Sequence, residues 1–569
     1  MRRSRIIIAV AAAALAVPAL ATVGTAGAAS QSASQGAAAS YVVLAGTGQS
    51  AQALADQLSA GGASVTSVNQ AIGLITVTSR DTAFAPRTRG LAGVDGVARD
   101  RSIGFSPKAS AHHDAVENEA GLSAGASSAS SQKGSSRPGD PLDDLLWGMD
   151  MINAPAAHAI EIGDHRVTVG ILDTGVDGSH PDLHSNFSKK LSRNFTTDMT
   201  DIDGPCEFAG CVDPADWDDN GHGTHTAGTI AAALNGMGLS GVAPGATLVN
   251  IRGGQDSGYF FLGPVTNALT YAGDIGIDVV NMSFYVDPWL YNCAGGAPED
   301  SPAEAADQAV IIEGMTRALN YANGHDVTLV GALGNNHEDL ANPRHDFSSP
   351  DYGAPTHERT ISNATCLNLP VEGPHVIGVS SLGPSSRKAD YSNYTTDLTS
   401  GEIEVSAPGG WFRDGFGTPS YRTNENEILS TAPTHVLQNE GLVDADGNIT
   451  PAGTALGVKK SCNDEGECGF YQYLQGTSMA SPHAAGVAAL AVSAHGSKDA
   501  DAHRGLTMAP AAVAALLAST ATDHACPAGG VQSYTQVGRS AEFTATCVGT
   551  PEFNGFYGAG IVNALGVVQ

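Results

Sequence analysis

Three side chains that lie far apart in the chain have, between them, the chemistry of an activated nucleophile. Ser478 begins a run of small residues that predicts a helix, with Thr477 as its cap, and the free N–H groups at a helix start favour a developing negative charge. His222 stands at the start of another predicted helix, and Asp173 directly follows a predicted strand. A serine hydroxyl is unreactive without a base to take its proton and an acid to orient that base. The hypothesis therefore requires a fold that brings the three together.

Each residue also has an ordinary structural interpretation. Ser478 could be a simple cap, and Asp173 a carboxylate that accepts hydrogen bonds from nearby backbone N–H groups. His222 and His225 could bind a metal, but their spacing, with no acidic residue on that helix, is weak evidence for zinc. A general base is the better interpretation of His222, and packing that of His225. Asn335, at the end of another predicted strand, is either a turn former or a hydrogen-bond donor to an oxyanion.

The elements that would position these residues alternate along the chain. Short apolar runs rich in β-branched residues predict buried strands, and helical stretches lie between several of them; the strands are at 166–172, 247–251, 278–282, 327–331 and 375–379, and the helices at 222–234, 263–273 and 303–323. This alternation implies an α/β domain with a mainly parallel sheet covered on both faces. Active sites in such sheets form beyond the carboxyl ends of the strands.

The motifs around the three residues resemble those of the subtilisin family of serine proteases. They occur in the order Asp173-Thr174-Gly175, His222-Gly223-Thr224-His225 and Gly476-Thr477-Ser478-Met479-Ala480-Ser481-Pro482. Shorter matches lie at 180–183, 241–244, 280–283, 407–409 and 557–564. The order Asp, His, Ser separates the chain from chymotrypsin-like and α/β-hydrolase arrangements. The resemblance implies a subtilisin-like three-layer α/β domain from residue 141 to the C-terminus.

The resemblance also implies an activity. It is that of a serine endopeptidase acting through Asp173, His222 and Ser478, with the Asn335 side chain and the Ser478 N–H as oxyanion donors and no cofactor required for the chemistry. Its partners would be protein or peptide substrates, and a narrow-specificity processing peptidase or an exopeptidase is the alternative. The implied substrate-binding residues are Ser257, Gly258, Ser283, Phe284 and Gly334. The family often has Leu-Gly where this chain has Phe284-Tyr285, so bulky rings would narrow or reshape the groove.

The N-terminal part divides into three segments. Residues 1–29 have the basic start, apolar stretch and small-residue end of a signal peptide, which predicts a secreted, extracellular protein. Residues 30–105 alternate strand-like and helical stretches and predict a small α+β unit, which resembles the inhibitory propeptide of secreted subtilisins. Residues 106–140 are dense in Ser, Ala and Gly and predict an exposed, flexible linker with a maturation site. The catalytic domain would then span 141–569, with the protein's own propeptide as its inhibitor.

Charge and cysteine content limit the partners and the compartment. A formal net charge of −30 argues against nucleic acid or an anionic membrane as a partner and suits a monomer that avoids self-association. Export would place the eight cysteines in an oxidising compartment, where an even number suggests disulfides. The expected pairs are Cys206–Cys211 and Cys462–Cys468, which bracket short loops, and by elimination Cys293–Cys366 and Cys526–Cys547.

No set of metal ligands follows from the sequence. The acidic stretches 198–203 and 213–219 could bind structural calcium or form a solvated face. The loop 234–239 is one residue shorter than the family's calcium-wrapping loop, which puts the family's calcium site at Asp182 in question.

Overall fold

The computed structural model describes residues 35–101, 114–119, 139–352, 355–498 and 505–569. The predicted signal peptide and most of the predicted linker lie outside these ranges. Among the described residues, none of the helices combines the length and the apolar content that a membrane span requires.

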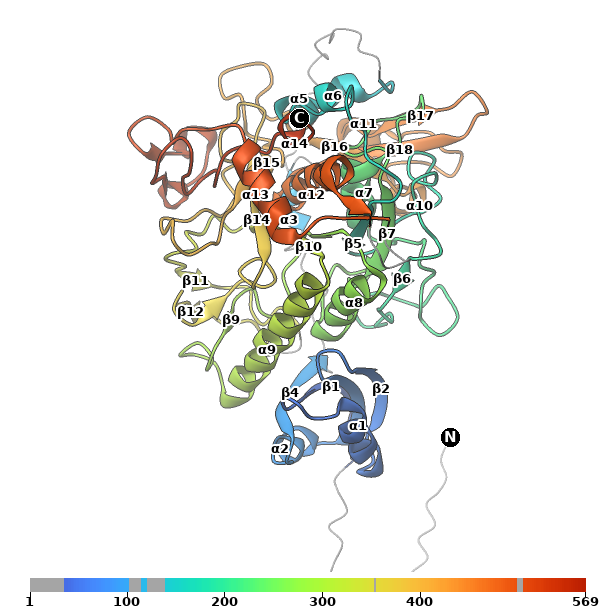
Figure 1. Cartoon of the computed structure of the whole chain (residues 1–569), viewed down its shortest axis with the longest axis vertical. Helices are drawn as coiled ribbons and strands as arrows, with labels where there is room; N and C mark the ends of the chain where they lie inside the picture. The colour runs from blue at the N-terminus through green and yellow to red at the C-terminus, as the bar shows by residue number, and fades with distance from the viewer. Residues whose placement is uncertain (1–34, 102–113, 120–138, 353–354, 499–504) are drawn as a thin grey trace, which may run out of the picture.

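A seven-stranded sheet forms the centre of the large domain, and its neighbouring strands run parallel (Figure 1). The strand order is β15-β14-β10-β8-β5-β7-β6. The strands are β5 Thr168–Leu172, β6 Arg193–Asn194, β7 Thr247–Arg252, β8 Val279–Met282, β10 Thr328–Ala332, β14 Val376–Leu382 and β15 Val405–Pro408. All five apolar runs that predicted strands belong to this sheet. The two strands that the sequence did not predict, β6 and β15, lie at its edges.

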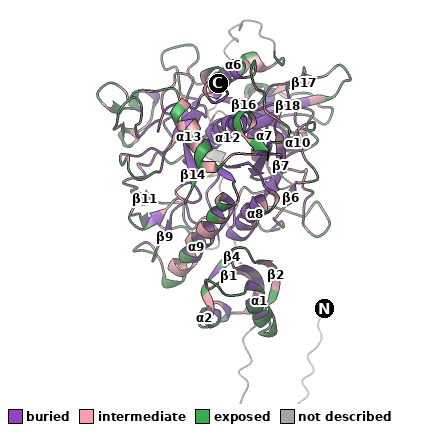
Figure 2. Ribbon diagram, in the orientation of Figure 1, coloured by how far each residue is buried: buried purple, intermediate pink, exposed green. Residues whose placement is uncertain are grey.

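Helices cover both faces of the sheet and complete three layers. Helices α8 (Leu262–Ile275) and α9 (Pro302–Gly324) lie on one face, and α7 (His222–Ala231) and α12 (Thr477–His495) lie on the other (Figure 1). Side chains of β5 alternate between the two cores, because Ile171 packs with α7 and α12 whereas Leu172 packs with α8 and α9. Buried residues concentrate in the sheet and in α12 (Figure 2). The predicted three-layer α/β architecture with a mainly parallel sheet is confirmed.

Local sequence explains where helix α9 begins and how closely helix α12 packs against its neighbour. Ser301 caps α9, its side chain accepting from the Glu304 N–H while the Glu304 side chain accepts from the Ser301 N–H. Helix α12 is thin because it is built from small residues. At Gly486 a Cβ would lie only 2.5 Å from the Cβ of Val242, so a larger residue would push the helix away from its neighbour.

The N-terminal unit is an antiparallel four-stranded sheet with two helices, which agrees with the predicted small α+β unit. Its strand order is β2-β3-β1-β4, and its elements are β1 Gln35–Ala45, α1 Ala51–Ala60, β2 Ser64–Asn69, β3 Leu74–Asp81, α2 Phe84–Arg89 and β4 Val94–Arg101. It packs against α8 and α9, below the large domain in Figure 1. Arg317 of α9 donates to the carbonyl oxygens of Ala45 at 2.8 Å and Ile72 at 3.1 Å, and Asn69 donates to Thr270 of α8 at 2.7 Å.

Smaller elements and four disulfides complete the large domain. Cys206–Cys211, Cys293–Cys366, Cys462–Cys468 and Cys526–Cys547 are all paired, which confirms the four expected disulfides. The smaller helices are α5 Trp147–Met151, α6 Ala154–Ala157, α10 Thr434–Asn439, α11 Pro451–Ala455, α13 Pro510–Thr520 and α14 Ala564–Val567. The smaller strands are β9 Asn292–Cys293, β11 His345–Asp346, β12 Arg359–Thr360, β13 Cys366–Leu367, β16 Ile428–Ala432, β17 Lys459–Cys462, β18 Cys468–Leu474, β19 Ser497–Lys498, β20 Leu506–Thr507, β21 Val531–Gln532 and β22 Ala545–Thr546.

Candidate active site

Asp173 and His222 meet at the carboxyl end of β5. Asp173 directly follows the strand, is fully buried, and accepts the Thr174 N–H on Oδ1 at 2.8 Å. His222 is the first residue of α7, and its Nδ1 lies 2.7 Å from Oδ1 of Asp173. Gly223 permits this approach, because a Cβ there would lie 2.0 Å from the carbonyl oxygen of Gly175. The carboxylate fixes the orientation of the imidazole and leaves Nε2 as the ring nitrogen that can exchange a proton in the pocket.

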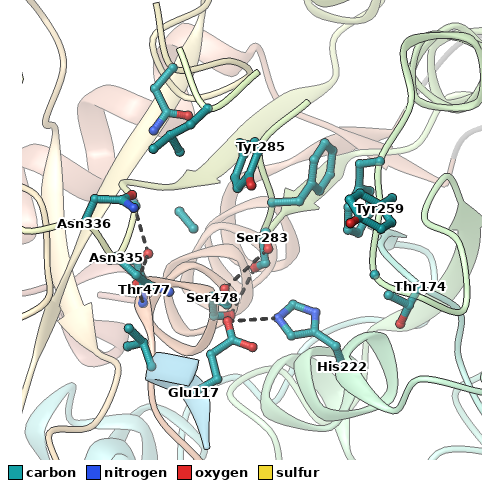
Figure 3. A pocket seen from close by; sticks show the side chains of 18 of the residues that line it. Glu117, Thr174, His222, Tyr259, Ser283, Tyr285, Asn335, Asn336, Thr477 and Ser478 are labelled. Atoms are coloured by element: carbon teal, nitrogen blue, oxygen red, sulfur yellow. Dashed lines mark hydrogen bonds and ion pairs between the residues drawn. The ribbon is translucent and has the colours of Figure 1, made fainter. Parts of the chain in front are cut away.

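Ser478 enters the same pocket from the first turn of α12 (Figure 3). Its hydroxyl donates to the carbonyl oxygen of Ser283 at 3.4 Å, and the Ser283 hydroxyl donates to the Ser478 carbonyl oxygen at 3.0 Å. The prediction that Thr477 caps this helix is wrong, because the cap is Gly476 and Thr477 is the first helical residue. The Thr477 hydroxyl instead donates a hydrogen bond to Oδ1 of Asn335 at 2.8 Å.

The side-chain amide of Asn335 is held through its oxygen. Oδ1 accepts the Thr477 N–H at 2.9 Å and the Thr477 hydroxyl at 2.8 Å. The amide nitrogen is therefore left to donate elsewhere, and Asn335 lines the pocket together with Ser478. Nδ2 lies 3.3 Å from the position that a Cβ on Gly476 would take, close to the helix start. A donor at this place can bind a negative oxygen that forms next to Ser478.

The sequence-predicted site residues gather around one pocket of about 210 Å³. The predicted residues that line it are His222, Ser257, Gly258, Ser283, Phe284, Gly334, Asn335 and Ser478. Asp173 does not line the pocket but contacts the imidazole that does.

Aromatic rings form one wall of the pocket. Phe284 stacks on Phe260, with ring centroids 4.1 Å apart and planes 3° from parallel. Tyr259 and Tyr285 also line the pocket, and the Tyr285 hydroxyl donates to Asp351 at 2.7 Å. The rings of Phe284 and Tyr285, which we expected to narrow or reshape the substrate groove, both line this pocket.

Glu117 also lines the pocket, and the sequence did not indicate it. It belongs to α3 (Asp114–Glu117), and its Oε1 lies 3.5 Å from Nε2 of His222 (Figure 3). Its carbonyl oxygen accepts the Gln475 N–H at 3.3 Å, and the carbonyl oxygen of Val116 accepts from the Gln475 side chain at 2.8 Å. The segment 116–119 therefore occupies the cleft directly beside the imidazole.

This position differs from the exposed linker that the sequence predicted for 106–140. Glu117 is 6% exposed and Glu119 is 7% exposed, so these two side chains of the predicted linker are buried, whereas Asn118 between them is exposed. Composition predicts the average character of a segment, and the contacts of a few residues within it do not change that average. The only local signal is that acidic residues interrupt the Ser- and Ala-rich run at 114, 117 and 119.

The charges around His222 favour its protonated form. Burial of the imidazole acts to lower its pKa, but the carboxylates of Asp173 and Glu117 outweigh burial and raise the pKa of His222 well above 6.5. The contact with Glu117 therefore shifts His222 toward the protonated form, in which the imidazole cannot accept a proton from Ser478.

His225 has the surroundings of a packing residue. Its Nε2 lies 3.0 Å from the carbonyl oxygen of Ile428, and the side chain is fully buried. Burial lowers the pKa of His225 to about 3, so the ring is neutral at ordinary pH.

Three groups of side chains among the described residues have the donor atoms for a metal ion, and one of them contains a buried carboxylate without a partner. Carboxylate oxygens of Asp198, Glu207 and Asp213 lie within 4.8 Å of one another. Asp198 is 6% exposed, and among the described residues neither of its carboxylate oxygens has a hydrogen-bond partner. Burial first, and the nearby carboxylate of Asp213 second, raise the pKa of Asp198 to about 6. A buried carboxylate without donors is costly unless a cation compensates its charge, and carboxylate oxygens are ligands that Ca²⁺ prefers.

Asp182, where the resemblance implied a calcium site, has hydrogen-bond donors around its carboxylate. Its oxygens accept from the Leu239 N–H, the Tyr471 hydroxyl and the Asn235 side chain, each at 3.0 Å. Donors of the protein itself therefore satisfy the oxygens of Asp182.

Known proteins resemble this chain in sequence and in fold. The model of the subtilase family matches residues 164–560. M-protease of Shouchella clausii and Subtilisin BL of Lederbergia lenta are each 27% identical to it over 344 residues, which is 60% of this chain. The match spans 58% of the length of M-protease and 82% of that of Subtilisin BL.

A solved structure shows that the fold is shared more widely. The epidermin leader peptide processing serine protease of Staphylococcus aureus is 19% identical, with a TM-score of 0.59, and the match covers 93% of this chain and 98% of that one. The family match spans most of the chain and includes the segments that carry Asp173, His222 and Ser478. The chain therefore belongs to the subtilase family, a family of serine peptidases.

Proposed function

We propose that this protein is a secreted serine endopeptidase that cleaves peptide bonds through an acyl-enzyme intermediate on Ser478. The observation that carries the proposal is the 2.7 Å hydrogen bond between His222 and Asp173 beside the pocket that Ser478 lines. Membership of the subtilase family supports it independently.

In the proposed reaction, His222 Nε2 takes the proton of Ser478 as its Oγ bonds to the carbonyl carbon of the substrate. The same proton then passes to the leaving amine as the C–N bond breaks. Asp173 accepts the Nδ1–H and stabilises the imidazolium that forms between these steps. A water molecule, deprotonated by His222, then hydrolyses the ester and releases Ser478.

Two donors would bind the negative oxygen of each tetrahedral intermediate. They are the Nδ2 group of Asn335 and the backbone N–H of Ser478. The Thr477 contacts to Oδ1 support this role, because they fix the amide before the substrate arrives. Donors held in place need no reorganisation when charge develops.

The acyl side of the substrate would bind as an added strand along Ser257-Gly258 and Ser283-Phe284, next to Gly334 of the pocket lining. Ser257 is held by Asp203, which accepts its N–H at 3.0 Å and its hydroxyl at 2.7 Å. A fixed edge lowers the entropy lost when an extended peptide pairs with it.

The N-terminal unit, residues 30–105, would be the inhibitory propeptide, released by cleavage within 106–140 after the signal peptide has directed export. Its contacts with α8 and α9, including those of Arg317, support a docked unit before processing. We thus propose that the protein is exported, that proteins or peptides are its substrates, and that its own N-terminal unit is its partner before processing.

A narrow-specificity processing peptidase is the second candidate. The wall formed by Phe260 and Phe284 favours it, because stacked rings limit the side chains that the pocket accepts. The Staphylococcus aureus protein of similar fold is itself described as a leader peptide processing protease.

Digestion of an unfolded protein distinguishes these functions. Processed wild type, Ser478→Ala and the control Ser481→Ala are each incubated with the substrate, and the fragments are mapped by mass spectrometry. Ser481 is a matched control, because it lies one turn further along α12 and donates to Asn281 at 2.6 Å. An endopeptidase gives many internal cuts that Ser478→Ala abolishes and Ser481→Ala retains. Cuts at one sequence pattern would support a processing enzyme, and equal digestion by Ser478→Ala would refute the peptidase function.

We also propose that a structural calcium ion binds Asp198, Glu207 and Asp213. Asp213 connects this cluster to the cleft, because its Oδ2 accepts from Arg252 at 2.6 Å and Arg252 also pairs with Asp256, the neighbour of Ser257. The ion would neutralise the buried carboxylates and hold the substrate edge in place.

Thermal unfolding tests the calcium site without relying on activity. The melting temperature of the wild type should be higher in calcium than in EDTA, since a ligand at about 100 times its Kd adds about 2.7 kcal/mol of stability. Asp198→Asn should abolish the calcium-dependent increment. Glu304→Gln is the matched control. Glu304 belongs to another group of three side chains of the kinds that bind metals, Asp300, Glu304 and His357. In that group Asp300 is already paired with Arg359 at 3.0 Å. An increment that persists in Asp198→Asn would rule out this site.

A further inference from the structure

Two arginines from different loops converge on one carboxylate beside the cleft. Arg413 Nε donates to Oε1 of Glu119, and Arg539 Nη2 donates to Oε2 at 3.4 Å. The side chain of Gln475 adds a donor to Oε2 at 3.1 Å. Both oxygens of a carboxylate that is 7% exposed therefore have charged donors, the arrangement by which proteins select carboxylates.

The two arginines are held in place by groups other than Glu119. Arg413 Nη1 donates to the carbonyl oxygen of Val537 at 2.8 Å. Arg539 Nε donates to Asp390 at 2.6 Å, and its guanidinium lies 4.9 Å from the centre of the Phe543 ring. A site whose donors are fixed by their own loops loses little entropy when a carboxylate binds.

The charge of the group also calls for an anion. Arg413 and Arg539 carry two positive charges and Asp390 one negative charge, so one positive charge remains for Glu119 to neutralise. This positive excess is unusual in a chain with a formal net charge of −30. An acidic side chain is therefore favoured here over a neutral one, and a basic side chain is disfavoured.

The site adjoins the segment that lies beside His222, because Gln475 contacts both Glu119 and Val116. Gln475 contacts Val116 and Glu117 through its backbone and side chain and precedes the helix that carries Ser478. The edges proposed for the acyl side, at 257–258 and 283–284, line the same pocket as Ser478. Figure 3 shows Glu117 across Ser478 from Tyr285. Glu119 follows Glu117 by two residues.

We propose that Arg413 and Arg539 form a carboxylate-binding subsite on the leaving-group side of the cleft. In the unprocessed chain the subsite binds Glu119 and thereby holds Glu117 against His222. In the processed protein it binds an acidic side chain of the peptide substrate, two residues beyond the residue that takes the place of Glu117. The second part rests on the peptidase function proposed above.

A set of paired peptides tests the subsite on the processed enzyme. Internally quenched peptides share one acyl side and carry either Glu or Gln at one of the first five positions after the cleaved bond. Wild type should prefer Glu over Gln at one position by about tenfold in kcat/KM, because hydrogen bonds to charged groups exceed neutral ones by about that factor. In the double variant Arg413→Gln/Arg539→Gln this ratio should fall to about one. Arg344→Gln is the matched control and should retain the ratio, because Arg344 pairs with Glu338 at 3.0 Å.

The results separate the subsite from the peptidase function. Equal kcat/KM for Glu and Gln peptides at every position, or a preference that survives in the double variant, would overturn the subsite and leave the peptidase function intact. If the wild type cleaves none of the peptides and a serine-reactive phosphonate does not label its Ser478, both the subsite and the peptidase function are overturned.

The full-length chain provides a second test that leaves the arginines unchanged. Glu119→Gln should weaken the docking of the segment 116–119 and accelerate phosphonate labelling of Ser478 in the unprocessed protein by about tenfold. Asn118→Ala alters an exposed neighbour and should leave the labelling rate at the wild-type value. Labelling of Glu119→Gln at the wild-type rate would contradict the proposed anchoring.

Discussion

Replacing Gly223 by alanine should separate His222 from Asp173 without altering either residue. A Cβ at Gly223 would lie 2.0 Å from the carbonyl oxygen of Gly175 and 3.0 Å from the Cβ of Asp173. Real Cβ contacts below 3.0 Å are essentially unknown, and the obstructing atom belongs to the backbone. The start of α7 must therefore move away from the end of β5 by about 1 Å.

The magnitude follows from the distance between the two side chains. A displacement of about 1 Å lengthens the 2.7 Å contact between His222 Nδ1 and Asp173 Oδ1 beyond the hydrogen-bond range of about 3.2 Å. A misplacement of this size costs about 100-fold in catalysis, so kcat/KM of the processed enzyme should fall by about that factor.

The assay compares peptide hydrolysis and thermal unfolding in Gly223→Ala and in a glycine control. Gly324, at the end of α9, is the matched control, because a Cβ there meets nothing within 4 Å and Gly324→Ala should retain full activity. Gly223→Ala should remain folded, with a cooperative melting transition. If it is folded and hydrolyses peptides at the wild-type kcat/KM, the close approach of α7 to β5 does not position the imidazole and the reasoning fails.

Three further predictions concern the oxyanion donor, the pH dependence and the disulfides. Asn335→Ala should lower kcat by about 100- to 1,000-fold with KM little changed, whereas Asn336→Ala should not; similar losses in both would argue against an oxyanion role. Because the carboxylate of Glu117 helps to raise the pKa of His222, their ion pair stabilises the docked segment while the imidazole is protonated, and this stabilisation is lost as the pH rises through the raised pKa. Phosphonate labelling of the unprocessed chain should therefore increase toward alkaline pH, and Glu117→Gln should move that increase to lower pH; identical profiles would contradict the ion pair. Cys293 and Cys366 are separated by 73 residues, so replacing both by serine should lower the free energy of unfolding by about 4 kcal/mol in denaturant titrations, and a change under 1 kcal/mol would contradict the chain-entropy estimate.

The sequence predicted those parts of the fold that depend on local apolar patterns. Strands β5 and β8 are buried on both faces over most of their length, and such strands have the continuous hydrophobic signal found in the runs at 166–172 and 278–282. Edge strands such as β6, only two residues long, carry almost no pattern and were not predicted. The disulfide pairs were predictable because two of them close short loops and the remaining four cysteines then had few partners.

The residues of the site that belong to distinctive sequence motifs could be predicted. Residues near Ser478 and His222 stand in distinctive runs, and the pocket lining includes the segments expected at 257–258 and 283–284. Glu117 could not be predicted, because its contact with His222 joins residues 105 positions apart through a segment without periodicity. Arg413 and Arg539 lie on separate loops that only the folded chain brings together, so their shared carboxylate left no signal in the sequence.

Mass spectrometry of the phosphonate-labelled, processed protein tests the central claim most directly. A serine-reactive phosphonate should form one adduct, on Ser478, at a rate that Asp173→Asn and His222→Ala reduce sharply, and Ser478→Ala should neither be labelled nor cleave peptides. A folded, processed protein that forms its adduct on another residue, or that hydrolyses peptides equally well as Ser478→Ala, would contradict the assignment of Asp173, His222 and Ser478 as the catalytic residues.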